Sequence, residues 1–387
     1  MGFDAHKFYH KNFPNKGIRS NFPRDVDLTF LKDTEFPTVV YTGNQTLKIS
    51  RILGSKFDQK LIRRVSKKGL KIYLYEPLCF YIKGDTYNKS FYSEFSVHDD
   101  LTLIRSEELD SIQRLIDTHG FYNVTVYTCD YNVEKYLGPH YNFNIECKDL
   151  FLSDVKNIVK RKHKPKKIEK HFWCAIGRYT YPRHLIVSYL TNFTGNYTWH
   201  YEYEGDILGD DSWLEKEKLT EEMCSMLENG NKLLNHNYYN IDTESNSREL
   251  VTSLEGVYIP KLKNGIQSTK FLESYDNCFV AVVAETRFAQ PTANVSEKLL
   301  HCISSKTPFI LLAPPHTLEY VRSLGFKTFS KFWSEEYDTI EDPTQRLKEI
   351  FTVIDNIGLM NLSEIEQMYA EMAEILDFNV EILNNLK

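Results

Sequence analysis

Cys278-Phe-Val-Ala-Val-Val-Ala284, followed directly by Glu285, is the stretch of sequence that decides the fold. Its residues are apolar without interruption, which indicates a strand buried on both faces, as the strands of a parallel sheet are. A helical pattern from Val295 to Ser304 and a second apolar run, 308–315, come next. Strand–helix–strand alternation of this kind favours a doubly wound α/β domain.

The same alternation runs through the rest of the chain. Strands are predicted at 37–43, 70–76, 122–130, 171–176 and 325–329, and helices at 56–68, 106–120, 182–190 and 316–324. From Pro343 onward, two long helical patterns close the chain. We expect an α/β protein of two Rossmann-like domains facing a cleft, an N-terminal domain of 1–165 and a C-terminal domain of 166–387 that includes C-terminal packing helices.

Length and composition set the class of protein. A chain of 387 residues with 42% hydrophobic and 26% charged residues is an ordinary globular protein of two or three domains. The net charge of −6 excludes a uniformly basic nucleic-acid coat but leaves room for a local basic patch. The aromatic share is high, with 25 Tyr and 24 Phe, and such residues either fill cores or line clefts that grip sugars and bases.

The cysteines, the first residues of the chain and the lengths of its apolar runs indicate a cellular location. The 7 cysteines are scattered and form no CxxC pair, as expected for reduced thiols. The start of the chain lacks the apolar core of a signal peptide, and no apolar run approaches the roughly 20 residues that span a bilayer. We expect a soluble cytoplasmic protein without a membrane partner.

Acids and cations at predicted strand ends are the candidate ligand-binding residues of the C-terminal half. Glu285 and Thr286 end the strand quoted above, and Ser296, Glu297 and Lys298 begin the next helix. A helix start favours a phosphate or sugar hydroxyls, and carboxylates bind diols. Arg178, Arg183 and His184 stand where the second domain's first strand meets its helix, and could grip a diphosphate. A charged first turn and a surface turn with ion pairs are the alternatives.

Two acids in the first half are candidate catalytic bases. Glu76 precedes Pro77, and Asp130 follows Cys129, each at the carboxyl end of a predicted strand. A general base there would deprotonate an acceptor hydroxyl, although each acid could equally be a turn residue. The pair Asp99-Asp100 is a weaker candidate for the same role.

The most basic stretch of the chain lies between the two predicted domains. It is either a solvated linker or a strip that contacts the phosphates of nucleic acid, formed by Lys160, Arg161, Lys162, Lys164, Lys166 and Lys167.

Several classes of site are absent from the sequence. No P-loop, GxGxxG, HExxH or GxSxG motif occurs, which argues against those enzyme classes. Asp210-Asp211 lies in a polar stretch without a preceding apolar strand, and the histidines lack ligand spacing, so no metal site is predicted.

Three stretches of the C-terminal half resemble glycosyltransferase-like proteins of tailed phages. They are Glu285-Thr-Arg-Phe with Val295-Ser-Glu-Lys298, Thr307-Pro-Phe-Ile-Leu-Leu-Ala-Pro-Pro315, and Leu324-Gly-Phe-Lys-Thr-Phe329. They are also distantly similar to α-1,3-fucosyltransferases, whose donor site has an acid and a downstream T/S-E-K. In the first half, Tyr75-Glu76-Pro77-Leu78 and Tyr127-Thr-Cys-Asp130 resemble the same phage group, which is similar to phage DNA-base glycosyltransferases.

The resemblance implies a GT-B-like enzyme that uses a nucleotide-sugar donor, UDP- or GDP-linked, with no tightly bound cofactor and no required divalent metal. It implies an acceptor bound by the N-terminal domain and a donor bound by the C-terminal one, at Glu285, Glu297 and Lys298, with Arg178 and Arg183 at the diphosphate. It also implies a location in the host cytoplasm if a phage encodes the protein. The favoured acceptor is a hydroxymethylated pyrimidine in double-stranded phage DNA. A glycan-directed, fucosyltransferase-like enzyme and a non-catalytic protein that binds nucleotide-sugar or DNA are the alternatives. The sugar (hexose or pentose), the stereochemistry and the oligomeric state stay open.

Overall fold

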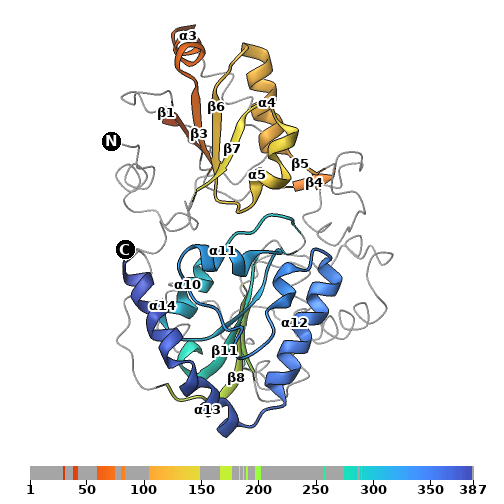
Figure 1. The fold of residues 1–387 in the computed structure, drawn as a ribbon, viewed down its shortest axis with the longest axis vertical. Coiled ribbons are helices and arrows are strands. Elements are labelled where there is room, and N and C mark those ends of the chain that lie inside the picture. The colour runs from red at the N-terminus through yellow and green to blue at the C-terminus, as the bar shows by residue number, and fades with distance from the viewer. Residues whose placement is uncertain are drawn as a thin grey trace, which may run out of the picture. The chain divides into compact units, whose positions relative to one another are not determined.

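The computed structural model describes residues 29–30, 38–41, 59–74, 80–82, 104–148, 166–176, 197–201, 257–258, 274–285 and 290–385, with the single residues 183, 186, 189, 190 and 288. The chain divides into two units (Figure 1). Unit 1 comprises Met1–Asn88, His98–Asn157 and Pro291–Asn294. Unit 2 comprises Lys89–Val97, Ile158–Gln290 and Val295–Lys387.

Unit 1 is built on a five-stranded sheet. Its order is β1 (Thr29–Phe30), β2 (Thr38–Tyr41), β3 (Leu70–Leu74), β6 (Val124–Thr128) and β7 (Asn144–Cys147), parallel except for β1 against β2. A separate antiparallel pair is formed by β4 (Phe80–Ile82) and β5 (Ile104–Ser106). The described helices of unit 1 are α3 (Gln59–Lys68), α4 (Glu107–His119), α5 (Val133–Tyr136) and the 3-10 helix η3 (Gly138–His140).

The core of unit 1 lies between one face of this sheet and the helices. Leu109, Ile112 and Ile116 of α4 pack in one cluster with Ile72 and Val126 of the strands. Capping fixes the ends of α4 as the sequence predicts: the Ser106 side chain accepts the Leu109 N–H, and Gly120 ends the helix at a φ of 64°.

Unit 2 is built on a fully parallel five-stranded sheet. Its order is β10 (Val257–Tyr258), β9 (Tyr197–Tyr201), β8 (Lys170–Ile176), β11 (Cys278–Ala284) and β12 (Phe309–Leu312). Every residue of β11 is buried, which confirms the strand predicted from its apolar run. The described helices are α10 (Glu297–Ser304), α11 (Thr317–Ser323), the 3-10 helix η8 (Glu336–Thr339), α12 (Pro343–Gly358), α13 (Leu362–Glu371) and α14 (Ala373–Asn385). The predicted mixed α/β class with parallel sheets is confirmed.

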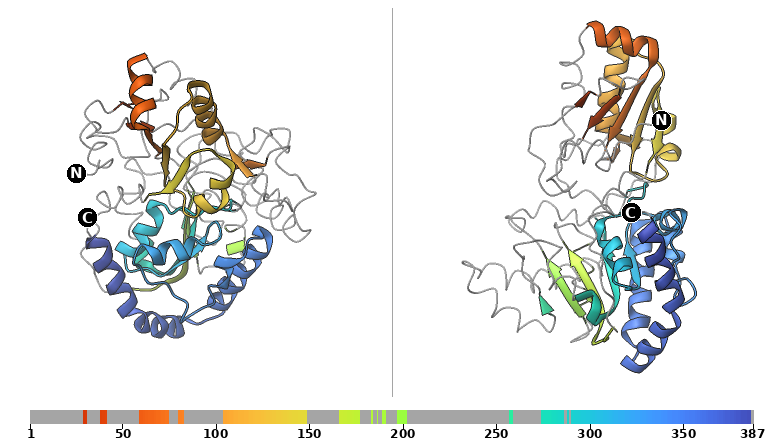
Figure 2. Two further views of the ribbon diagram at one scale, coloured as in Figure 1. Left: turned by 45° about the horizontal axis from the view of Figure 1, so that its top comes forward. Right: turned by 90° about the vertical axis from the view of Figure 1, so that its left-hand side faces the viewer.

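The C-terminal region differs in two respects from the sequence prediction. Two long helices are predicted there, but the structure has three: α13 ends at Glu371, the fully buried Met372 is its C-cap, and α14 begins at Ala373. α12, α13 and α14 gather on one side of the unit 2 sheet (Figure 2).

The predicted strand at 325–329 is wrong, because this segment is irregular. Its two buried aromatics, Phe326 and Phe329, are three residues apart, which does not match the two-residue period of a strand. Side chains satisfy its backbone instead of a neighbouring strand: Asn379 binds both the N–H and the carbonyl of Lys327, and Glu335 accepts the Phe329 N–H.

Candidate functional site

The carboxyl edge of the unit 2 sheet has a topological switch point. The chain runs outward from β8 through β9 to β10, then returns to β11 on the other side of β8. In open α/β sheets, ligands bind outside the carboxyl ends of the strands at the place where the order reverses. β8 and β11 flank that place, and the residue directly after β11 is Glu285.

Glu285 holds the start of α10. Its side chain is 2% exposed, and Oε1 accepts the backbone N–H of Ser296 at 2.8 Å. Burial raises the pKa of Glu285, and Glu297 adds to that rise, whereas Lys298, the Ser296 hydrogen bond and Arg183 oppose it. The carboxyl group therefore has two cations near it in an environment that disfavours its charge.

The first turn of α10 carries the other predicted donor residues. Ser296 is the N-cap of α10, and its hydroxyl accepts the Lys298 N–H at 3.4 Å. Lys298 Nζ lies 2.9 Å from Glu297 Oε1, and their side chains are 10% and 19% exposed. This turn presents a cation, an acid and a helix N-terminus at the switch point, the groups that would bind a diphosphate and a diol. Thr286 lies outside the described residues.

Arg183 reaches the same edge from another element. Its side chain is only 2% exposed, and Nε donates to the carbonyl of Ala284, the last residue of β11, at 2.9 Å. The structure therefore places this cation beside Glu285 in a buried position rather than at a surface turn. Arg178 and His184 lie outside the described residues.

Arg346 on α12 holds Phe288, in the stretch between Glu285 and α10, a role that was not predicted from the sequence. Its guanidinium, 1% exposed, donates to the carbonyls of Phe288 and Ile340 at 2.5 Å each and lies 4.4 Å from the centroid of the Phe288 ring. Burial lowers the pKa of Arg346 to about 10. One signal was available: Arg346 has the same helical spacing as the buried Ile350, so it stands on the apolar face of α12.

Asp130 is the buried acid of unit 1. It follows β6 and is fully buried, and Oδ2 accepts the hydroxyl of Thr128 at 2.6 Å. Its other oxygen, Oδ1, accepts the hydroxyl of Thr292 at 3.4 Å. Hydroxyl donors on both oxygens orient this carboxylate, as a general base requires. Glu76, the other predicted base, lies outside the described residues, as do Asp99 and Asp100.

The short segment Pro291–Asn294 belongs to unit 1, whereas the chain on both sides of it belongs to unit 2. Ala293 and Tyr131 form an antiparallel bridge, with N–H to carbonyl distances of 2.7 and 3.2 Å. The segment thus supplies the Thr292 hydroxyl to Asp130 and the Ala293 backbone to Tyr131, the residue after Asp130. No sequence pattern predicts this segment, because a short irregular stretch has no hydrophobic period.

Two members of the predicted basic strip fall in the described part of the chain. Lys166 Nζ donates to the Thr307 hydroxyl at 2.9 Å and lies 5.2 Å from the centroid of the Tyr369 ring. Lys167 forms an ion pair with Glu169 at 2.6 Å. Both ammonium groups therefore have partners within the protein. Lys160, Arg161, Lys162 and Lys164 lie outside the described residues.

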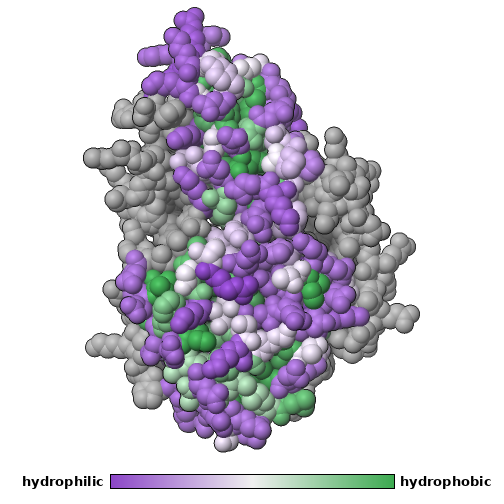
Figure 3. Space-filling view, in the orientation of Figure 1, coloured by the Kyte–Doolittle hydropathy of each residue, from purple (hydrophilic) through white to green (hydrophobic). Residues whose placement is uncertain are grey.

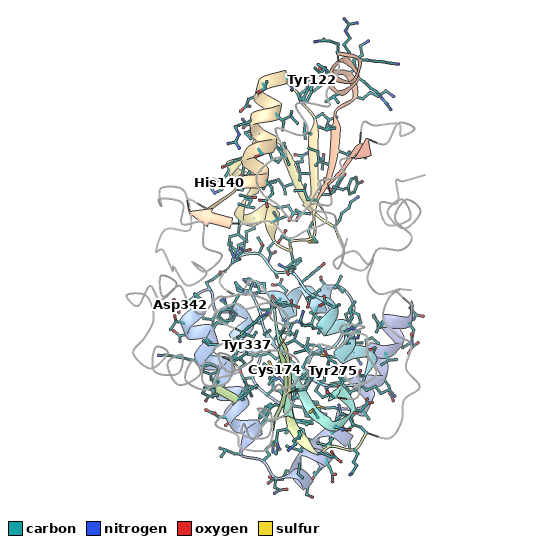
Figure 4. All side chains as sticks on the ribbon, turned by 180° about the vertical axis from the view of Figure 1, so that it is seen from behind. Tyr122, His140, Cys174, Tyr275, Tyr337 and Asp342 are labelled. Carbon is teal, nitrogen blue, oxygen red and sulfur yellow. The ribbon has the colours of Figure 1, made fainter. Side chains whose placement is uncertain are left out.

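The described residues contain neither a candidate metal site nor a candidate membrane-spanning helix. No group of three or more His, Cys, Asp or Glu side chains in this part of the chain could hold a metal ion. None of its helices combines the length and the apolar character required to cross a membrane. Figure 4 shows instead how densely buried side chains, among them Cys174 and Tyr275, fill the interior of unit 2.

No protein-family model matches the sequence, and no curated protein matches it. Solved structures of T4 phage β-glucosyltransferase are similar to the chain. One, of the DNA modifying enzyme with and without uridine diphosphoglucose, has 9% identity and a TM-score of 0.36, over 85% of this chain and 74% of that one. A point variant in complex with UDP-glucose has 10% identity and a TM-score of 0.38, over 91% and 79%. A complex with UDP and Mn²⁺ has 8% identity and a TM-score of 0.34, over 91% and 79%.

At this identity and these TM-scores, the similarity assigns no residue role, substrate or metal to this chain. The roles proposed below rest on its own contacts.

Proposed function

We propose that the protein is a nucleotide-sugar-dependent glycosyltransferase whose favoured acceptor is a hydroxymethylated pyrimidine in phage DNA. One observation carries the proposal: at the switch point of the unit 2 sheet, Glu285 holds the N-terminus of α10, with Lys298 and Arg183 beside it. A helix N-terminus with cations next to it binds a diphosphate, and neighbouring carboxylates bind diols.

Unit 2 is the proposed donor-binding domain. Glu297, with a more exposed side chain than Lys298, accepts hydrogen bonds from a diol of the ribose or sugar. Lys298 exchanges its hydrogen bond to Glu297 for one to the diphosphate. Arg183, bonded to the carbonyl of Ala284, adds a second positive charge next to Glu285. Glu285 is a positioning residue, since its carboxylate is bonded to the backbone of Ser296. The donor is UDP- or GDP-linked, and these roles require no tightly bound cofactor or divalent metal.

Unit 1 is the proposed acceptor-binding domain, and Asp130 is the proposed base, with Glu76 as the other candidate. The base takes the proton of the acceptor hydroxyl, and the acceptor oxygen forms a bond to the anomeric carbon of the sugar. The bond between that carbon and the diphosphate oxygen breaks, and the diphosphate leaves with the electron pair. Lys298 and Arg183 stabilise the negative charge that develops on it. The predicted GT-B-like arrangement of two domains facing one cleft is part of this proposal.

The test is transfer to defined duplexes. The protein is incubated with UDP- and GDP-linked sugars and a duplex that contains hydroxymethylcytosine, with an unmodified duplex and a set of oligosaccharides as controls. We expect release of nucleoside diphosphate and a heavier nucleoside by mass spectrometry only with the hydroxymethylated duplex. Asp130→Asn should lower kcat while nucleotide affinity is kept, and Glu297→Gln should lower nucleotide affinity.

Two results would contradict parts of the proposal. Transfer to oligosaccharides alone would replace the DNA acceptor with a glycan. Nucleotide-sugar binding without turnover on any acceptor would leave the non-catalytic binding protein as the function.

A further inference from the structure

α3 of unit 1 carries an unbroken row of positive charge that the proposed function does not use. Its sequence, QKLIRRVSKK, contains five cations and no acid. They occupy positions i, i+3, i+4, i+7 and i+8, which places them on one face of the helix. This basic stripe is formed by Lys60, Arg63, Arg64, Lys67 and Lys68. Hydrophilic side chains cover α3 in Figure 3.

The stripe is unlike an ordinary solvated helix face. Such faces mix both signs, because like charges three or four residues apart destabilise a helix. Lys67 and Lys68 lie at the C-terminal end of α3, where the helix dipole stabilises a cation. Lys60 lies in the first turn, where the dipole destabilises one. Lys60, Arg63 and Lys67 have no ion pair with any residue of the described ranges. In a chain whose net charge is −6, this concentration of cations points to an anionic partner.

The dimensions of the stripe suit a nucleic-acid backbone. From Lys60 to Lys68 it extends about 12 Å along the helix, at about 1.5 Å per residue. One strand of duplex DNA carries a phosphate about every 3.4 Å along its axis, so the stripe spans about three or four phosphates. Arg63 and Arg64 add planar donors that bind phosphate oxygens in pairs.

An exposed aromatic residue lies next to the stripe. Tyr122 is 62% exposed, the highest value among the large aromatic side chains of the described residues. Its neighbour Asn123 accepts the N–H of Leu70 at 3.1 Å, directly beyond the end of α3 (Figure 4 labels Tyr122). Aromatic rings beside cations are typical of nucleic-acid surfaces, where they pack on sugars and bases.

We propose that the basic stripe of α3 and Tyr122 form a docking surface for the phosphate backbone of duplex DNA. This inference rests on the proposed DNA acceptor and adds a second contact to it. α3 leads into the amino end of β3, whereas Asp130 follows the carboxyl end of the parallel neighbour β6. The C-terminal end of the stripe therefore lies about one strand length, roughly 17 Å, from Asp130. The surface contacts DNA at a distance from the nucleotide that accepts the sugar, so the enzyme favours long duplexes as acceptors.

The test is the salt dependence of DNA binding. Binding of a 24-base-pair unmodified duplex is followed by fluorescence anisotropy between about 50 and 200 mM salt, without any sugar donor. The variant carries Lys60→Gln, Arg63→Gln and Lys67→Gln. Each phosphate contact contributes about 0.9 to the slope of log affinity against log salt. We therefore expect the slope to become shallower by about 2–3 and the affinity at 50 mM salt to fall at least about 10-fold.

A matched control separates the stripe from net charge. Lys327→Gln, Lys331→Gln and Lys348→Gln remove the same charge from exposed positions of unit 2. They should leave the slope unchanged. Tyr122→Ser, which changes no charge, should lower affinity about threefold without altering the slope.

Each outcome decides the proposal. An α3 variant that binds duplex with the control's affinity and slope overturns it, even if transfer to hydroxymethylated DNA has been demonstrated. A wild-type protein that binds no duplex overturns both this surface and the DNA acceptor. Loss of binding to phosphatidylserine vesicles in the α3 variant, with duplex binding kept, would assign the stripe to a membrane and overturn it.

Discussion

Arg346→Met should destabilise unit 2 and loosen the loop that leads to the proposed donor site. The guanidinium donates to the carbonyls of Ile340, Glu341 and Phe288 and lies over the Phe288 ring. Three bonds from a charged donor contribute about 5 kcal/mol together, and the ring contact about 1 kcal/mol. Methionine fills much of the same space, so most of the effect comes from these polar contacts.

The loss of stability in Arg346→Met is smaller than the sum of these contacts, because burial of the guanidinium in the wild type also costs the free energy of removing its charge from water. Burial lowers the pKa of Arg346 to about 10, which is the sign of that cost. If removal of the charge returns about 2–3 kcal/mol, the net loss is about 3–4 kcal/mol, as is usual when one partner of a buried polar network is removed. At a urea dependence of about 2 kcal/mol per molar, the midpoint falls by about 1.5–2 M.

Tryptophan fluorescence during urea unfolding measures this change in unit 2 alone. The chain has 4 tryptophans, and the sequence places all of them in segments of unit 2. Lys348→Met, at an exposed position of the same helix, is the matched control and should shift the free energy of unfolding by less than about 0.5 kcal/mol. If Arg346→Met unfolds at the same urea concentration as this control, the three carbonyl contacts do not stabilise unit 2 and the reasoning is refuted.

Three further predictions concern other positions. The raised pKa of Glu285 means that its contribution to stability is present below its usual value of 4.5 and is lost as pH rises through the raised value. Glu285→Gln cannot titrate, so the variant should not lose this stability. Its free energy of unfolding in urea, relative to that of the wild type, should therefore rise from pH 4 to pH 8. A difference between the two proteins that does not change with pH would contradict the raised pKa. Thr292→Val should lower kcat about 3- to 10-fold with unchanged nucleotide affinity in a calorimeter, because Asp130 loses one hydroxyl donor worth about 1 kcal/mol; a matching fall in nucleotide affinity would speak against the role of Thr292. Gly69→Ala should destabilise unit 1 by about 2–3 kcal/mol in thermal unfolding, since Gly69 has a φ of +86° and its new Cβ would lie 2.3 Å from the Asn123 carbonyl; an unchanged melting temperature would refute this.

Features that depend on nearest neighbours in sequence could be predicted. The uncharged, valine-rich run of β11 is typical of a buried strand, and Ser106 and Ser296 stand where a helix needs a side-chain acceptor. Glu285 and Asp130 follow apolar strands, so their place at the carboxyl edges of the two sheets follows from the parallel order.

Features that depend on a distant backbone partner could not be predicted. Hydrophobic spacing predicts that Arg346 stands on the buried face of its helix, but it does not predict that the guanidinium donates a hydrogen bond to the Phe288 carbonyl. The backbone of Lys327 is paired with the side chain of Asn379, 52 residues away, which no local pattern reveals. The bridge between Tyr131 and Ala293 is of the same kind.

That bridge has a consequence for the order of events during synthesis. A unit that ended at Asn157 could fold as soon as it left the ribosome, but unit 1 also needs Pro291–Asn294. This segment is translated about 140 residues later, which at about 5–20 residues per second is a delay of roughly 7–28 s. Until then, the backbone of Tyr131 lacks its partner and Asp130 lacks the Thr292 hydroxyl. The acid proposed for catalysis therefore reaches its final hydrogen-bonded state only after most of unit 2 has been made.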